Sequence, residues 1–173
     1  ILSKSKGIFW ARHIGVPEFK DGKCIRISGL VQDIDHEKRL KLELAFSEEI
    51  FRTTFEYAAI GMIVVDLKGR LQKANPKICE ILGYREKEIL EKTVLDFVHP
   101  EDVESSKALF EKTIATQSGF KMEKRCRHRN GSYLWIYEAV AAVKNDKGEL
   151  MHFVAQIQDI SDKKQMTENL TEH

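Results

Sequence analysis

Two short segments of the chain share one transition, from a β-like stretch into a charged stretch that favours helix. The segments are VQDIDHEKR, residues 31–39, and IQDISDKKQ, residues 157–165. A single shift of 126 positions places Asp159 on Asp33. This spacing is too long for a solenoid unit and fits one domain plus a linker. This repeat constrains the fold strongly, because it predicts that two domains of the same kind end in the same way, with a strand that leads into a helix.

The same shift also aligns other parts of the two segments. It places Gly148 on Gly22 and Trp135 on Phe9, so a turn residue and an aromatic position coincide. The second copy has room for a whole domain before its end, whereas the first does not. We therefore predict that residues 1–34 are the C-terminal strands of a truncated first domain.

Composition limits the class of protein. Apolar residues make up 42% of the chain and charged residues 32%, with a formal net charge of +1. Apolar content is sufficient for a core, and no basic surface is indicated that would require nucleic acid or anionic lipid. No apolar run approaches the ~18 residues of a membrane span. Three widely separated cysteines fit a reducing compartment and argue against a disulfide scaffold. We expect a cytoplasmic protein.

The N-terminal third predicts a hairpin followed by a long helix. Residues 8–19 and 24–33 are β-rich and flank the turn signal Asp21-Gly22. Residues 35–57 contain no Gly or Pro and predict a linker helix, for which Asp35 is a plausible N-cap. The hairpin would expose a half-core, so we expect another chain or the second domain to cover it.

The linker helix has an apolar stripe on an otherwise charged surface. This stripe favours either packing on its own domain or a short coiled-coil dimer, and two or three heptads do not decide between them. The candidate dimer residues are Leu40, Leu44, Phe51 and Phe55.

Residues 58–160 predict strands at both ends and helices in the middle. Asn75 is the expected cap of a helix with Pro76 at its first position and Gly83 at its end, and Gly119 is the expected end of a longer helix. Three β-rich runs follow, joined by two hairpin signals. This order predicts an α+β fold: one antiparallel sheet with helices on one face.

Several stretches of this region resemble the PAS family of sensory domains. They are GMIVVDLKGRLQKANPKICEILGY, FVHPEDV, RHRNGSYLWI and the closing QDIS. The resemblance implies a five-stranded antiparallel PAS sheet over residues 58–160, with an exit signalling helix beginning in residues 161–173. It also implies that the repeated phrase is the end of two tandem PAS domains, each leading into a helix.

The resemblance further implies two kinds of site. A cavity, where present, would lie between the sheet and the long helix. Its candidate lining is Phe110, Ile114, Met122, Cys126, Phe153, Ala155 and Ile157, which equally well fill a core. Signal transfer would pass through the strand-to-helix exits, at Asp33, Asp35, Asp159 and Ser161. Ser161 is expected to cap the exit helix through its hydroxyl group.

Catalytic and metal chemistry have no pattern in this sequence. No nucleophile–base grouping, phosphate-binding Gly loop or metal-ligand spacing is present, so we expect no enzyme activity and no metal. The resemblance implies that a photochemical flavin site would need a reactive Cys in a particular helix motif and a Gln two positions before the closing Asp. Cys79 lies in a different motif, and Gln158 lies only one position before Asp159. No cofactor is predicted, although a small apolar or aromatic ligand is possible.

The leading interpretation is a sensory or transducer module of a bacterial multidomain signalling protein. It would form a homodimer through the linker helix or the PAS surface and pass a conformational signal to a downstream output domain. The alternatives are a ligand-free dimerisation module and, less favoured, a flavin- or haem-bearing redox sensor.

Overall fold

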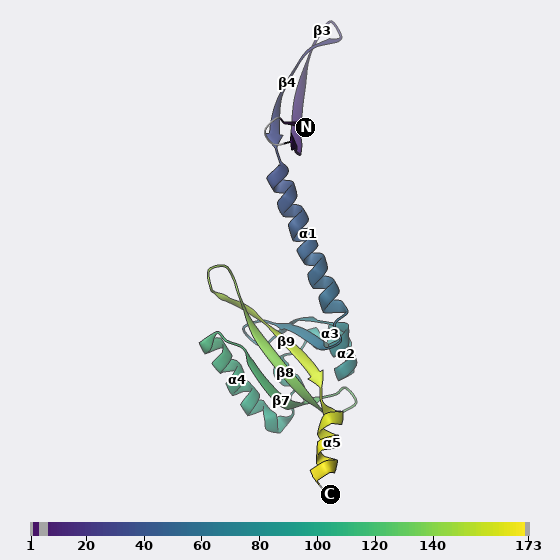
Figure 1. The fold of residues 1–173 in the computed structure, drawn as a ribbon, viewed down its shortest axis with the longest axis vertical. Coiled ribbons are helices and arrows are strands. Elements are labelled where there is room, and N and C mark those ends of the chain that lie inside the picture. Colours follow the sequence, from purple (N-terminus) through teal and green to yellow (C-terminus); the bar gives the residue numbers. More distant parts are fainter. Residues whose placement is uncertain (1, 4–6, 172–173) are drawn as a thin grey trace. The chain divides into compact units, whose positions relative to one another are not determined.

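The chain divides into two compact units, residues 1–52 and 53–173. The computed structural model describes residues 2–3 and 7–171 (Figure 1). Helix α1, Asp35–Glu56, begins in the first unit and ends in the second.

The first unit is built around an antiparallel hairpin. Its strands are β3, Ala11–Lys20, and β4, Lys23–Asp33, and two short strands precede them, β1 at Leu2–Ser3 and β2 at Gly7–Ile8. Asp21 and Gly22 both have positive φ, 51° and 74°. A two-residue turn of this kind matches the natural twist of a hairpin. The local turn signal therefore formed the expected hairpin.

The second unit is a five-stranded antiparallel sheet with helices. The strands are β5 Gly61–Val65, β6 Leu71–Ala74, β7 Phe120–Arg127, β8 Tyr133–Lys144 and β9 Leu150–Asp159, in the spatial order β6-β5-β9-β8-β7. Between β6 and β7 come α2 Pro76–Leu82, α3 Glu86–Leu90, the 3₁₀ turns Val94–Phe97 and Pro100–Asp102, and α4 Val103–Thr116. Helix α5, Ser161–Thr171, leaves after β9 (Figure 1). The predicted α+β class is confirmed.

Asn75 holds three elements of this unit together. Its side-chain oxygen accepts the amide of Ile78 at 3.0 Å, which caps α2 as predicted, and the amide of Met62 on β5 at 2.8 Å. Its side-chain nitrogen donates to the carbonyls of Phe55 and Ile60, each at 3.0 Å. The side chain is fully buried, so this amide is satisfied entirely by the protein.

The predicted end of the long helix is wrong. Gln117, with φ 51°, takes the left-handed position that closes α4, and Gly119 lies beyond it. A Cβ atom on Gly119 would lie 2.1 Å from the carbonyl oxygen of Val140. Glycine is therefore required at this position by the close approach of β8 and not by the helix end.

The core of the second unit lies between the inner face of the sheet and helices α2, α3 and α4. Phe153 on β9, Ile136 on β8 and Ile78 on α2 are almost completely buried there. Phe110 of α4 meets Phe153 edge to face, with ring centres 5.3 Å apart. This contact fixes α4 over the central strands, which places the candidate cavity beneath it.

Candidate functional site

Three hydrogen bonds shape the exit from β9 into α5, and two of them join it to Trp135 on β8. The amide of Ile160 donates to the carbonyl of Trp135 at 2.8 Å, and the amide of Ser161 donates to the carboxylate of Asp159 at 2.9 Å. The hydroxyl of Ser161 accepts the amide of Trp135 at 3.1 Å. The start of the helix is therefore anchored to the neighbouring strand.

This geometry corrects the predicted cap. The amide of Lys164 donates to the carbonyl of Ile160 at 2.9 Å, so the first helical turn closes on Ile160. Ser161 already lies inside the helix, and its hydroxyl bonds to Trp135 of β8 instead of capping the first turn. The Ser161 hydroxyl therefore holds α5 against the sheet and does not stabilise the first turn of the helix.

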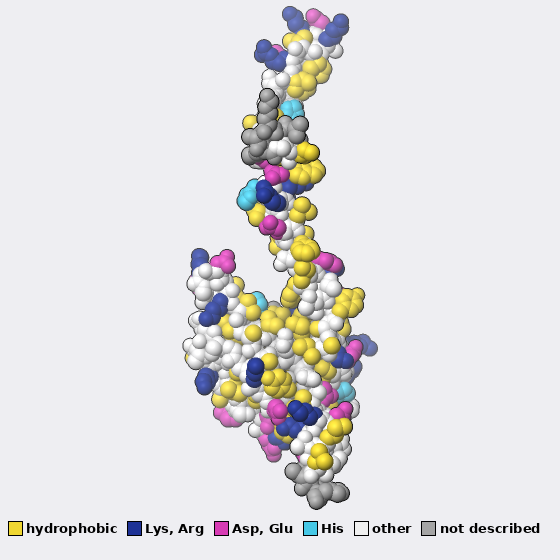
Figure 2. Space-filling model, in the orientation of Figure 1, with side chains coloured by type: hydrophobic (Ala, Val, Ile, Leu, Met, Phe, Trp, Pro, Cys, Tyr) yellow, Lys and Arg dark blue, Asp and Glu magenta, His cyan; other side chains and the backbone are white. Residues whose placement is uncertain are grey.

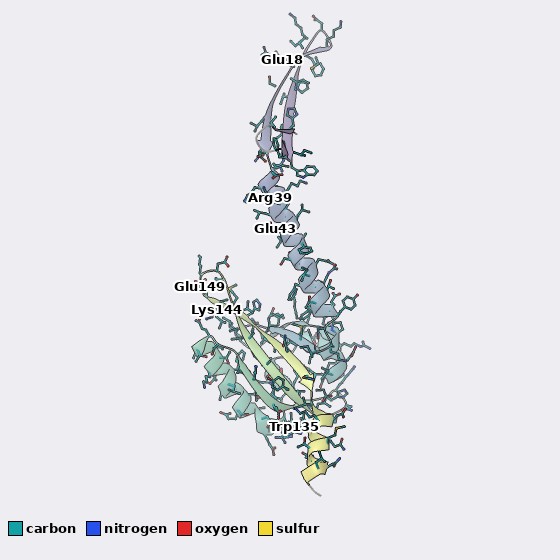
Figure 3. All side chains as sticks on the ribbon, viewed as in Figure 1. Glu18, Arg39, Glu43, Trp135, Lys144 and Glu149 are labelled. Carbon is teal, nitrogen blue, oxygen red and sulfur yellow. The ribbon has the colours of Figure 1, made fainter. Side chains whose placement is uncertain are left out.

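A lysine over an indole adds a second attachment. The ammonium of Lys164 lies 4.8 Å from the centre of the Trp135 ring and 2.5 Å from the carboxylate of Glu123 on β7. The guanidinium of Arg125 lies 5.6 Å from the same ring. Figure 3 labels Trp135 where α5 leaves the sheet. Lys164 thus connects α5 with β7 through the carboxylate of Glu123 and with β8 through the ring of Trp135.

The exit from β4 into α1 repeats this arrangement in the first unit. The amide of Ile34 donates to the carbonyl of Trp10 at 3.0 Å, and that of Asp35 donates to the carboxylate of Asp33 at 3.0 Å. The amide of Trp10 donates to the side chain of Asp35 at 3.4 Å. The ammonium of Lys38 lies 5.3 Å from the Trp10 ring. Asp35, like Ser161, is inside its helix, which corrects its predicted role as the N-cap.

Strand register is the same in the two hairpins. Ala11 faces Asp33 in the first, as Ile136 faces Asp159 in the second. Both registers continue for eight pairs before a shift. Because a register is set over the whole length of a hairpin, this agreement concerns the strands and not only the exits.

The hairpins even share a bulge. The register shifts after Glu18 in the first hairpin and after Val143 in the second, which lie 125 positions apart. Figure 3 labels Glu18 near the tip of one hairpin and Lys144 near the tip of the other. Bulges occupy specific positions in a fold, so their coincidence supports a common origin of the two hairpins.

The structure corrects the alignment of the first strands. Trp10, not Phe9, corresponds to Trp135, because 125 positions separate Trp10 from Trp135 while 126 separate Asp33 from Asp159. The extra residue lies in the turn of the second hairpin, where Asn145 pairs with Glu149 across a longer loop. An alignment without a gap could not find this tryptophan pair.

Two small cavities lie inside the core of the second unit, each of about 30 Å³. Of the predicted pocket residues, Cys126 and Ile157 line one of them. Phe110, Phe153 and Ala155 line the other. Ile114 packs against the core, and Met122 on β7 is half-buried, both outside these linings.

Both cavities contain a polar feature that the sequence reasoning missed. Lys124 on β7 and Glu138 on β8 are 6% and 5% exposed, and their side chains form an ion pair at 2.5 Å. Strict alternation from Met122 and Cys126 places Lys124 on the inner face, so the period of the strand was the available signal. The predicted lining contained only apolar residues and therefore omitted this ion pair.

A second ion pair fixes the segment before α4 to β7. Arg125 donates through two nitrogens to the carboxylate of Asp102, at 2.9 and 3.0 Å, and through its amide at 2.9 Å. Hydrogen bonds from the Arg125 side chain hold the pKa of Asp102 below its usual value. Arg125 also pairs with Glu101 at 2.8 Å. These bonds give the FVHPEDV stretch a structural role.

The predicted dimer residues of α1 differ in burial. Leu40 and Leu44 are exposed, Phe51 is about half exposed, and Phe55 is buried in the second unit. Further exposed apolar residues of α1 are Leu42, Phe46 and Ile50. Figure 2 shows hydrophobic side chains along the hairpin and α1. The helix therefore carries more unburied apolar surface than the predicted stripe.

Two classes of feature are missing from the part of the chain that the structure describes. No cluster of three or more His, Cys, Asp or Glu side chains that could hold a metal ion occurs there. Among residues 2–3 and 7–171, no helix has the length and apolar character needed to cross a membrane.

Comparison with known proteins identifies the second unit. Residues 72–157 match the family model of the PAS fold. The chain contains a PAS domain. A PAS domain from Colwellia psychrerythraea superposes with a TM-score of 0.62 at 19% identity, covering 66% of this chain and 97% of that one. The N-terminal domain of a diguanylate cyclase from Marinobacter aquaeolei gives 0.55 at 25% identity, covering 60% and 97%.

Two curated relatives of this PAS protein are, by name, a cyclase and a kinase. A probable diguanylate cyclase of Escherichia coli, DgcE, is 37% identical over 119 residues, which are 68% of this chain and 11% of the relative. Sporulation kinase E of Bacillus subtilis is 27% identical over 143 residues, 83% of this chain and 19% of the relative. The chain therefore spans less than a fifth of the length of these relatives. PAS domains are generally sensory and not catalytic.

Proposed function

We propose that this chain is a conformational relay in a cytoplasmic bacterial signalling protein, with the PAS domain as the sensing unit. Helix α1 brings a signal from a preceding PAS domain, whose last two strands are β3 and β4, and α5 passes it toward an output domain. A homodimer contact along α1 would make helix packing depend on the state of the PAS core.

The observation that carries this proposal is the repeated exit. Trp10 and Trp135 each bond a helix start through both their amide and their carbonyl, and each has a lysine of that helix over its ring. A helix joined to a sheet by its first turn moves when the sheet moves. Because α1 and α5 are attached in the same way, a conformational signal could pass from one PAS domain to the next and then to the output domain.

Hydrogen exchange of the two helices tests the relay. Ile63 lines both core cavities, so Ile63→Ala should perturb the core and change the exchange rates of amides in the first turn of α5 and the last turn of α1. Met62, its neighbour on β5, lies on the other face, and Met62→Ala is the control. Unchanged exchange in both helices after Ile63→Ala would contradict the relay.

A matched pair on β4 tests the tandem arrangement. By register, Ile27 takes the place of the buried Phe153, and Leu30 takes the place of the exposed Gln156. The two side chains are equally exposed in the described chain, 66% and 65%. In the full-length protein, Ile27→Asp should destabilise the first unit by several kcal/mol and Leu30→Asp by far less. Equal losses of stability in the two variants would contradict the proposal that a whole first PAS domain buries the Ile27 face of β4.

A ligand-free interaction module is the second candidate, favoured by the size of the cavities. Ligand pockets commonly measure ~300–1,000 Å³, whereas each cavity here is about 30 Å³. Native mass spectrometry and an absorption spectrum of the purified protein separate the candidates. A bound mass favours sensing of a ligand, a coloured sample favours a redox cofactor, and an apo dimer favours the interaction module.

A further inference from the structure

The buried pair of Lys124 and Glu138 is only partly satisfied. Charged side chains in a core are costly unless the remaining donors and acceptors also find partners. An ammonium group has three N–H donors. Among the described residues, Glu138 is the one hydrogen-bond partner of the Lys124 ammonium. Two donors of this buried lysine therefore have no partner among the described residues, and Lys124 lines both cavities.

Ser106 of α4 is a second, independent sign of a missing partner. Its side chain is 5% exposed, and its hydroxyl has no hydrogen-bond partner among the described residues. A serine inside a helix ordinarily bonds to a carbonyl of the preceding turn. Thr113 of the same helix does so, donating to Leu109 at 2.8 Å. Ser106 instead lines the cavity that Lys124 and Glu138 also line.

The cavity beside Ser106 has the character of a small polar site with apolar walls. Phe110, Phe153 and other apolar side chains surround it, and its polar groups come from α4, β7 and β8. About 30 Å³ exceeds the ~10–15 Å³ that one water requires, so a molecule of a few atoms fits. Polar cavities of this size are occupied, whereas apolar ones stay empty.

Charge restricts the class of occupant. The Lys124–Glu138 pair is neutral as a whole, so an ionised ligand would add an uncompensated charge to the core. An uncharged molecule adds none. Its oxygen could accept from the lysine and from the serine hydroxyl, which satisfies both groups at once.

We propose that Ser106, Lys124 and Glu138 form a binding site for a small uncharged molecule that carries a hydroxyl or carbonyl oxygen. Water fills the site in the absence of that molecule. The proposal rests on the sensory function proposed above and names the ligand class of the same core. A ligand held here bridges α4 to β7 and β8, so its arrival changes how the helix sits on the sheet that leads to α5.

Formamide and formate are matched probes, because each has three non-hydrogen atoms and only formate is charged at pH 7. A ligand of three such atoms binds no tighter than about 0.5 mM. Each probe is titrated into the ¹⁵N-labelled chain while backbone amide NMR signals are followed. We expect saturable shifts at Ser106, Lys124 and Glu138 with formamide and none with formate.

Two serine variants provide the control. Ser106→Ala removes an unsatisfied hydroxyl, so the fold should remain intact, and formamide should bind about fivefold more weakly. Ser105 is exposed and bonds to the carbonyl of Asp102, so Ser105→Ala should bind like wild type. Absence of saturable formamide shifts, equal binding of formate, or equal binding by Ser106→Ala would overturn the proposal. The relay is judged separately, by the exchange of α5 in Ile63→Ala.

Discussion

The ammonium of Lys164 lies 4.8 Å from the centre of the Trp135 ring, so the first turn of α5 is held against the outer face of β8. The same side chain pairs with Glu123 on β7. Lysine and tryptophan meet in this way at the start of α1 as well, through Lys38 and Trp10. Two helices of different sequence thus begin with one attachment, which makes the attachment a good target for experiment.

Trp135→Leu should loosen α5 while leaving the sheet folded. The change removes the ring beneath Lys164, a contact that contributes about 0.5–1 kcal/mol at a site of this exposure. Backbone bonds from residue 135 remain. We expect hydrogen exchange of α5 amides to rise severalfold with little change in β5 or β9. Lys163→Met, at the exposed neighbouring position, should leave exchange near wild type. Equal rates in all three proteins would show that the ring contributes nothing to the attachment.

Asn75→Ala should be among the most destabilising single changes in the PAS domain. It removes four hydrogen bonds of a fully buried side chain and leaves the amides of Met62 and Ile78 without their acceptor. Each buried unsatisfied group costs about 1–3 kcal/mol, so we expect a loss of about 3 kcal/mol or more in the free energy of unfolding. Urea denaturation measures it. Asn145→Ala, in an exposed turn, should cost far less, and similar losses would refute the assigned role.

Stability should fall in acid partly through Asp102. Its folded pKa is lowered by the side-chain hydrogen bonds from Arg125, so the unfolded state takes up a proton before the folded state does. The stabilisation is complete above the unfolded pKa, near 3.8, and is lost as pH falls through the lower folded value. Asp102→Asn should therefore be less stable than wild type at pH 7 and show a flatter decline between about pH 5 and 2. Parallel curves would argue against this contribution.

Leu40→Glu/Leu44→Glu should convert a dimer into a monomer. Both leucines are exposed on α1, and burial of each against a partner would contribute about 1.5–3 kcal/mol. Sedimentation equilibrium at about 50 μM detects micromolar dimers. Ala45→Glu adds a charge on another side of the same helix and should leave the dimer unchanged. A monomeric wild type, or an undiminished dimer in the double variant, would show that α1 is not the dimer contact.

The three cysteines should react with a thiol reagent in order of exposure. Burial raises the pKa of Cys126 to about 12, and that of Cys79 is raised in the same direction by burial and by Glu86, whereas Cys24 is exposed on the hairpin. Since the thiolate is the reactive form, Cys24 should be labelled first at pH 8 and Cys126 only after unfolding. Peptide mapping by mass spectrometry follows each site. Labelling of Cys126 as fast as Cys24 would contradict its burial.

The turns and helix starts of this protein could be predicted from the sequence alone, because they depend on local chemistry. Asp21-Gly22 can form a tight turn, and Asn75-Pro76 can begin a helix, whatever surrounds them, because both signals depend only on neighbouring backbone. Alternation along β7 is a local signal of the same kind, and it places Met122, Lys124 and Cys126 on one face. These signals, in their order along the chain, were sufficient for the α+β class and the PAS resemblance.

Tertiary structure decided the relationships between distant residues. Whether Lys124 meets Glu138 depends on the register of β7 against β8, which is set by pairing along both strands. Ser161 could have capped its own helix, yet the backbone of Trp135 lies within reach and binds its hydroxyl. The match of Trp10 with Trp135 depends on one extra residue in a turn, and only the shared strand register reveals it.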